Sequence, residues 1–149
     1  MNQSPDQAME LALGQAMLSG VDVPVGAVLL DPSGQVVASA HNERELTGDP
    51  TAHAELLAIQ RLGKAKGDWR LEDLTLVVTL EPCAMCAGAI VAARIPKVIF
   101  GAFDEKVGAA GSRYDLLRDS RLGNPVEVVA GVREAECSKL LKDFFEAKR

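Results

Sequence analysis

The sequence predicts an α/β protein in which helices cover both faces of a mixed β-sheet. Two short apolar runs, over residues 25–30 and 36–40, flank the turn-forming residues 31–34 (Asp-Pro-Ser-Gly) and predict an antiparallel hairpin. Beyond residue 50, stretches with helical periodicity alternate with short runs rich in β-branched residues. This alternation is typical of strands joined by helices that pack on the two faces of one sheet.

The first helix has clear signals at its start. Ser4 is a candidate N-cap, Pro5 suits the first helical position, and Gln7 completes a capping box. We expect this helix to end at Gly20. Apolar residues at helical spacing mark its inner face: Met9, Ala12, Leu13, Ala16 and Met17.

The remaining elements follow in chain order, and glycine and proline residues set several of their limits. A helix over residues 52–66 is ended by Gly67, and Pro82 opens a further helix that ends near Arg94. Strands are expected over residues 74–79, 97–100 and 126–130, a short helix near residues 114–118, and a last helix over residues 134–147.

The helix that Pro82 opens is apolar on every side from Ala84 to Ala93. A helix of this composition is normally buried all round. One side can pack on the sheet, and we expect a second subunit to cover the other side. The sequence therefore predicts a homodimer.

Length and composition limit the possible classes of protein. The 149 residues suffice for one domain with its own core, and we assign residues 1–149 to a single domain. No apolar run is long enough to span a membrane, and no secretory signal pattern is present. Three cysteines, two of them at metal-binding spacing, favour a reducing, cytoplasmic location. The formal charge of −5 argues against extensive contact with nucleic-acid phosphates.

Two short motifs carry most of the functional information, at residues 53–55 (His-Ala-Glu) and 82–86 (Pro-Cys-Ala-Met-Cys). His53, Cys83 and Cys86 are ligands of the types that zinc prefers, and three protein ligands leave the fourth position open for water. Zinc lowers the pKa of such a water molecule, and Glu55 can transfer protons as general acid and base. The motifs therefore predict a catalytic zinc site.

The spacing within the motifs places these groups at helix starts. Cys83 and Cys86 are three residues apart and share one face of a helical turn. His53 and Glu55 are two apart, so both reach one metal only if it lies beyond the helix end. We therefore expect two helix N-termini to converge on zinc, where their dipoles favour thiolates. A structural zinc site completed by Cys137 or His41 is the alternative.

These motifs resemble the signature of the zinc-dependent nucleobase deaminases, H-x-E followed by P-C-x-x-C. The resemblance is most specific to the bacterial tRNA-specific adenosine deaminases. It implies a cytidine-deaminase-like fold, which is a three-layer α/β/α sandwich with a five-stranded mixed sheet, and one zinc ion per subunit. The matching blocks occur in the family's order and nearly span the chain: residues 23–28, 41–42, 49–55, 79–88, 108–112 and 137–145.

The same resemblance implies the reaction and its site residues. The reaction is hydrolytic deamination of adenosine to inosine at the wobble position of a tRNA anticodon. Glu55 would be the proton shuttle, and the partner would be the anticodon stem-loop rather than DNA or a membrane. Contacts with the substrate would come from Asn42, the Ala54 backbone, Asp104 and Phe145. Phe103 departs from the pattern, since relatives often carry a charged residue there.

Two other interpretations of the zinc motifs remain. The first is a deaminase of a free base or nucleoside, such as guanine, cytosine or cytidine. Asn42, the block at residues 108–112 and the helix with Phe144 and Phe145 favour tRNA over these small substrates. The second is a zinc-stabilised binding module without activity, against which the intact Glu55 argues.

Overall fold

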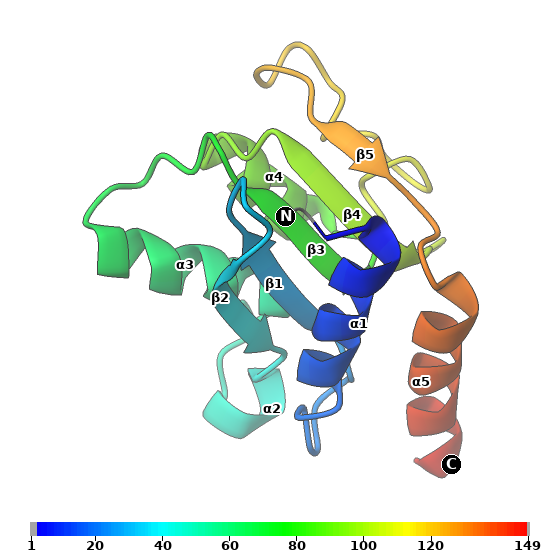
Figure 1. The fold of residues 1–149 in the computed structure, drawn as a ribbon. Coiled ribbons are helices and arrows are strands. Elements are labelled where there is room, and N and C mark those ends of the chain that lie inside the picture. The colour runs from blue at the N-terminus through cyan, green and yellow to red at the C-terminus, as the bar shows by residue number, and fades with distance from the viewer. Residues whose placement is uncertain (1–2, 149) are drawn as a thin grey trace.

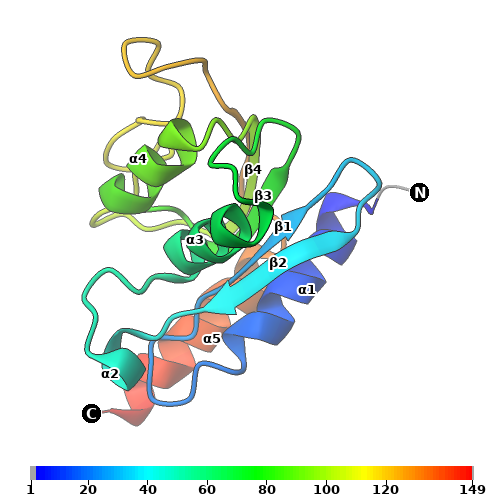
Figure 2. The same cartoon turned by 90° about the vertical axis from the view of Figure 1, so that its left-hand side faces the viewer.

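The computed structural model describes residues 3–148, which form a five-stranded sheet covered by helices on both faces (Figures 1 and 2). The strand order is β2-β1-β3-β4-β5; β1 is antiparallel to its neighbours β2 and β3, whereas β4 is parallel to its neighbours β3 and β5. The predicted three-layer sandwich is thereby confirmed. The elements are α1 (Pro5–Ala16), β1 (Gly26–Leu30), β2 (Val36–His41), α2 (Arg44–Thr47), α3 (Ala54–Lys66), β3 (Thr75–Leu80), α4 (Ala84–Ala92), β4 (Lys97–Ala102), β5 (Glu127–Val129) and α5 (Glu134–Ala147).

Two hydrophobic cores lie on opposite faces of the sheet because successive side chains of a strand point to opposite sides. Leu76 and Val78 of β3 pack in one core with Ile90 of α4. Val77, between them, packs in the other core with Met9 of α1. Figure 2 shows α3 and α4 on one side of the sheet and α1 and α5 on the other. The central strands are therefore buried on both faces.

Local signals in the sequence account for several element limits. The Ser4 hydroxyl accepts a hydrogen bond from the Gln7 backbone at 3.2 Å, and the Gln7 side chain accepts one from the Ser4 backbone at 3.0 Å, so the capping box is confirmed. Gly34 closes the hairpin turn by donating its N–H to the Asp31 carbonyl at 2.9 Å. Gly67 ends α3 in the left-handed conformation, with φ of 67°.

Three details of the predicted secondary structure are wrong. Helix α1 ends at Ala16 rather than Gly20, and Met17 is 74% exposed instead of joining the inner face. No helix forms over residues 114–118, because Ala110 pairs with Asp115 in an isolated β-bridge and the chain is held in turns.

The third error is the omission of helix α2. Its first turn is capped by the buried carboxylate of Asp22, which accepts the backbone N–H groups of Glu45 at 2.7 Å and Leu46 at 3.1 Å. A cap that lies about 20 residues away in the sequence leaves no local signal, which explains the omission.

Helix α4 is covered on one side only. Cys86, Ala87 and Ile90 are buried against the rest of the chain, whereas Ala84, Met85 and Gly88 are exposed. The prediction that α4 is buried all round therefore requires a partner on its outer side.

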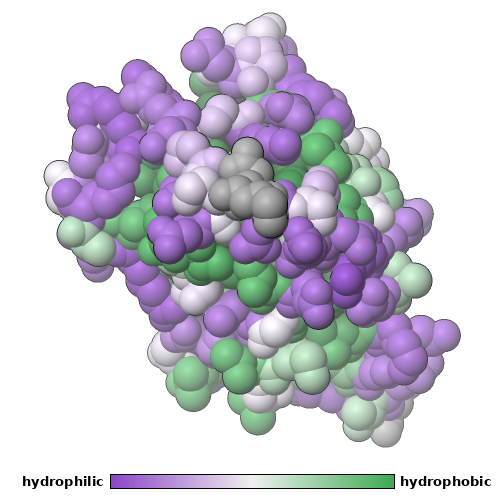
Figure 3. All heavy atoms as spheres, viewed as in Figure 1, coloured by the Kyte–Doolittle hydropathy of each residue, from purple (hydrophilic) through white to green (hydrophobic). Residues whose placement is uncertain are grey.

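The outer surface carries a mixture of polar and hydrophobic groups. On the face seen in Figure 3, hydrophilic residues predominate and hydrophobic residues show between them. Among residues 3–148, no helix combines the length and the apolar character needed to cross a bilayer.

Candidate active site

The start of helix α3 and the start of helix α4 carry the predicted metal ligands. His53 is the N-cap of α3 and Cys83 the N-cap of α4, and both have extended backbone conformations. A tight turn positions His53, since its N–H donates to the Thr51 carbonyl at 2.7 Å and Asp49 accepts the Thr51 N–H at 2.8 Å. The two predicted helix N-termini therefore do meet at one place.

The spacing of the three donor atoms fits a zinc ion. The Nδ1 atom of His53 lies 3.6 Å from the sulfur of Cys83 and 3.6 Å from the sulfur of Cys86. Tetrahedral zinc with ordinary bond lengths to sulfur and nitrogen places such atoms about 3.6 Å apart. The nitrogen that faces the two sulfurs is Nδ1, which the sequence could not specify. His53, Cys83 and Cys86 could thus hold one zinc ion.

Neither candidate for a fourth protein ligand joins this group. Cys137 lies in the hydrophobic core on the opposite face of the sheet, with α1. The Nδ1 atom of His41 lies 3.1 Å from the Asn42 carbonyl oxygen. Within the described part of the chain, the cluster contains three residues. This geometry favours the open, catalytic type of zinc site over the structural type.

Glu55 lies in the first turn of α3, two residues after His53, and lines the cavity described below. Only 4% of the residue is exposed. This burial raises the pKa of the Glu55 carboxyl group to about 7, because the charged form loses its hydration. A carboxyl group with a pKa near neutrality is suited to both accept and return a proton.

The two thiols of the cluster differ in acidity because they share hydrogen bonds. A hydrogen bond from Cys86, followed by one involving His53, lowers the pKa of Cys83 to about 4. The same contact with Cys83 raises the pKa of Cys86 above that of an ordinary thiol. The hydrogen bond with Cys83 also raises the pKa of His53. The site thus stabilises a thiolate, which is the form that binds metal.

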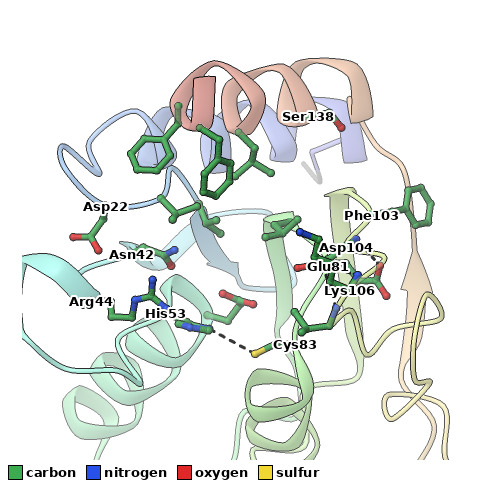
Figure 4. A pocket seen from close by; sticks show the side chains of 18 of the residues that line it. Asp22, Asn42, Arg44, His53, Glu81, Cys83, Phe103, Asp104, Lys106 and Ser138 are labelled. Carbon is green, nitrogen blue, oxygen red and sulfur yellow. Dashed lines mark hydrogen bonds between the residues drawn. The ribbon is translucent and has the colours of Figure 1, made fainter. Parts of the chain in front are cut away.

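A cavity of about 780 Å³ opens next to the cluster and is bounded by several parts of the chain. Figure 4 shows Asn42, Arg44 and His53 on one side of it and Cys83 and Asp104 on the other. Its walls come from the segment after α1, the start of α2, the starts of α3 and α4, residues 103–107, and α5. Three of the four predicted substrate contacts line the cavity, namely Asn42, Asp104 and Phe145. The fourth, Ala54, is not among the lining residues.

Asn42 has a structural role in addition to its place on the cavity wall. Its side-chain oxygen accepts the backbone N–H of Ala54 at 2.9 Å. Asn42 therefore satisfies a free N–H at the start of α3, where His53 itself provides no side-chain cap. The Ala54 side chain is fully buried, so this residue is available only through its backbone.

The outer part of the cavity is aromatic and partly basic. Phe144 and Phe145 of α5 meet edge to face at 5.2 Å, and the Lys148 ammonium lies 4.9 Å from the centre of the Phe144 ring. Phe103, on the opposite side, packs edge to face on Phe100 at 5.2 Å. Aromatic rings beside cations are suited to stack bases and to pair with phosphates.

Several residues of this region carried no functional prediction from the sequence. Arg44, Lys106 and Glu81 line the cavity, and Glu81 is nearly buried. Glu81 precedes the Pro-Cys motif directly, which was the one local signal for it. Burial acts to raise the pKa of Glu81, but hydrogen bonds led by that from Ser112 outweigh burial and lower it.

Comparisons with known proteins agree with this site. The sequence pattern of the cytidine and deoxycytidylate deaminase zinc-binding region matches residues 2–102. The tRNA-specific adenosine deaminase of Bacillus subtilis is 52% identical over 128 residues, which is 86% of this chain and 79% of the relative.

Solved structures show the same relationship. One from a study of A-to-I editing by tRNA:A34 deaminases at the wobble position has a TM-score of 0.85 and 40% identity, and covers 91% of this chain and 99% of the other. The guanine deaminase of Bacillus subtilis has a TM-score of 0.66 and 34% identity, and covers 74% and 71% respectively. The chain therefore belongs to the cytidine and deoxycytidylate deaminase zinc-binding family and, within it, to the tRNA-specific adenosine deaminases.

Proposed function

We propose that this protein converts adenosine to inosine at the wobble position of a tRNA anticodon. The observation that carries the proposal is the cluster of His53, Cys83 and Cys86 at the wall of a cavity that Glu55 also lines, in a chain with this family membership. The reaction consumes one water molecule and releases one ammonia molecule, so it needs a nucleophile and a proton carrier.

Each of these requirements has a candidate group. Zinc held by His53, Cys83 and Cys86 would lower the pKa of a water molecule so that it can attack near neutral pH. A carboxylate oxygen of Glu55 would accept a proton from that water and deliver it to the adenine ring. Glu55 would then accept the remaining proton of the attacking water's oxygen and pass it to the departing amine, which leaves as ammonia. Its burial and its pKa of about 7 support this shuttle role.

We assign the substrate contacts to Asn42, Ala54, Asp104 and Phe145, and three of these four line the cavity. The side-chain oxygen of Asn42 is used by Ala54, so its amide nitrogen is the group left to donate to a purine. Ala54 would act through its backbone. Asp104 and Phe145 stand on the outer wall, where nucleotides next to the target would lie.

A polymer substrate fits the cavity better than a free base. The cavity has a volume of about 780 Å³ and continues from the zinc cluster to the aromatic residues of α5. A single base fills only part of this space. Bases of an anticodon loop can be turned outward and stacked on aromatic rings. The alternative, a deaminase of guanine, cytosine or cytidine, makes no use of the outer part.

We further propose that the protein is a single-domain, cytoplasmic homodimer. The exposed side of α4, with Met85 and Gly88 on it, supports the dimer. None of Cys83, Cys86 and Cys137 forms a disulfide, which supports a reducing compartment. Light scattering at micromolar concentration should give twice the mass of one chain, and a stable monomer would contradict the dimer.

The direct test is inosine formation in an anticodon hairpin with adenosine at the wobble position. Nuclease digestion and mass spectrometry should show inosine at that position alone. A hairpin with guanosine at the wobble position and the Glu55→Ala protein are the two controls. Absence of inosine, combined with release of ammonia from free guanine or cytidine, would support the small-molecule alternative.

A further inference from the structure

Glu81 lies next to the zinc cluster, and the chemistry proposed above does not use it. It follows β3 directly, precedes the ligand Cys83 by two residues, and is only 2% exposed. A carboxylate so deeply buried needs several hydrogen-bond donors to remain ionised.

All the donors that the described structure gives this carboxylate come from residues 104–112. One oxygen, Oε1, accepts the backbone N–H of Asp104 at 3.0 Å and the hydroxyl of Ser112. The other, Oε2, accepts the backbone N–H groups of Ala110 and Ser112, each at 3.0 Å. Glu81 thus holds both ends of this segment, which contains neither a helix nor a strand.

Residues 104–112 are also hydrogen-bonded to the backbone next to the predicted zinc ligand Cys83. The N–H of Ala109 donates to the Pro82 carbonyl at 2.7 Å, and Gly108 forms an isolated β-bridge with Cys83. A side chain at Gly108 would collide with the Glu81 carboxylate and the Asp104 carbonyl. Residues 104–112 are therefore packed closely around the Glu81 carboxylate, which accepts their hydrogen bonds.

The outer face of this segment is a wall of the cavity, formed by Asp104, Glu105, Lys106 and Val107. Figure 4 shows Glu81 next to Asp104 and on the same side of the cavity as Cys83. Glu81 also lines the cavity, but both of its carboxylate oxygens are occupied by donors of this segment, so a change at Glu81 acts on the substrate by moving the wall.

We propose that Glu81 is a positioning residue, which fixes residues 104–112 as the cavity wall and so sets the affinity for the RNA loop. This proposal rests on the proposed function, because it concerns the same cavity and substrate. It differs from a purely structural role in one respect. Loss of Glu81 should loosen one segment and weaken substrate binding, while the zinc cluster and the sheet keep their positions.

The sharpest variant is Glu81→Gln, which keeps the size of the side chain. Three of the four partners are backbone N–H groups, which can only donate, so the amide NH₂ group faces at least one such donor in either orientation of the side chain. At least one buried hydrogen bond is then lost and replaced by repulsion. Glu72→Gln is the matched control, since Glu72 is exposed, lies outside the cavity and loses the same charge.

Two measurements distinguish the roles. In Glu81→Gln, the amides of Asp104, Ala110 and Ser112 should exchange hydrogen at least about 10-fold faster, while amides of β1 and β3 keep their rates. The KM for the hairpin should rise about 10-fold or more, with kcat within about threefold and zinc content unchanged. Glu72→Gln should match the unmodified protein in every measurement.

Three results would overturn the proposal: unchanged exchange in the segment, equally faster exchange in β1 and β3, or a fall in kcat at constant KM. If Glu81→Gln does not fold, Ser112→Ala removes only the hydroxyl donor and should move exchange and KM in the same direction by a smaller factor. An unmodified protein that does not act on the hairpin would refute the proposed function, whereas local exchange tests the anchoring by Glu81 separately.

Discussion

The inner end of the cavity and its outer part are held in place in different ways. Glu55 and Cys86 at the inner end are 4% and 0% exposed, and both lie in the first turns of helices packed on the sheet. Phe103 and Phe145 in the outer part are 45% and 52% exposed. They come from a loop and from the second half of α5.

The outer part therefore has fewer fixed contacts. Cys137 is the one buried residue of α5, and Arg133, just before the helix, lies 3.3 Å from the Asp6 carboxylate. We infer that the inner end performs the reaction and the outer part selects the substrate. Changes at the inner end should abolish the reaction, while changes in the outer part should alter affinity by degrees.

The largest effect is expected from Cys86→Ala. Removal of one of three protein ligands should lower zinc content and activity together, to background. Metal analysis of the purified protein and an inosine assay check this. Cys137→Ala is the control, because Cys137 is a buried thiol on the other face of the sheet and should not alter zinc content. Full zinc occupancy in Cys86→Ala would contradict the ligand assignment.

Glu55→Ala should keep zinc and the fold but lose turnover. Glu55 is not one of the three clustered ligands, and general acid–base groups usually contribute about 10²–10⁴ in rate. Single-turnover measurements with saturating enzyme isolate this step from binding. A rate near that of the unmodified protein would show that another group moves the proton.

The pH dependence should follow the ionisation of Glu55. Its pKa is raised to about 7 by burial, and only the ionised form can accept a proton. The specificity constant kcat/KM should therefore rise as the pH increases from about 5 towards about 7. A bound cation favours the ionised form, so about 7 is the upper limit of the midpoint. A rate that falls over this pH range would contradict the assignment.

Asn42 lies between the two parts, and its two roles can be separated. Asn42→Ala should lower the free energy of unfolding by about 1 kcal/mol, because α3 loses its cap. Asn42→Asp keeps an oxygen for Ala54 and should stay close to the unmodified stability. Both variants lose the amide donor, so kcat/KM on the hairpin should fall about 10-fold in each, with zinc retained. Normal activity of Asn42→Asp would remove Asn42 from the substrate contacts.

The smallest effect concerns salt. Three cationic residues of the described chain, Arg44, Lys106 and Lys148, line the cavity. Contacts of one to three cations with single-stranded RNA give a log–log slope of affinity against salt of about −0.7 to −2. Filter-binding measurements of RNA affinity between about 50 and 200 mM salt would determine this slope. A much steeper slope would place a larger basic surface elsewhere on the protein.

The inner end was predictable because its residues lie close together in the sequence. His53 and Glu55, like Cys83 and Cys86, are paired within one helical turn, so local spacing fixed their relative positions. The hairpin turn and the limits of α5 also followed from local signals. Helix α2 and the segment at residues 104–112 did not, because Asp22 and Glu81 hold them from distant positions.

A comparison of substrates shows whether the outer part of the cavity selects an RNA loop. The value of kcat/KM should be measured for an anticodon hairpin with adenosine at the wobble position, and for free adenosine, cytidine and guanine under the same conditions. The hairpin should react at least about 100-fold more efficiently than any of the three, since only the hairpin can occupy the outer part of the cavity. A free base or nucleoside that equals or exceeds the hairpin in kcat/KM would contradict the tRNA assignment and establish the small-molecule alternative.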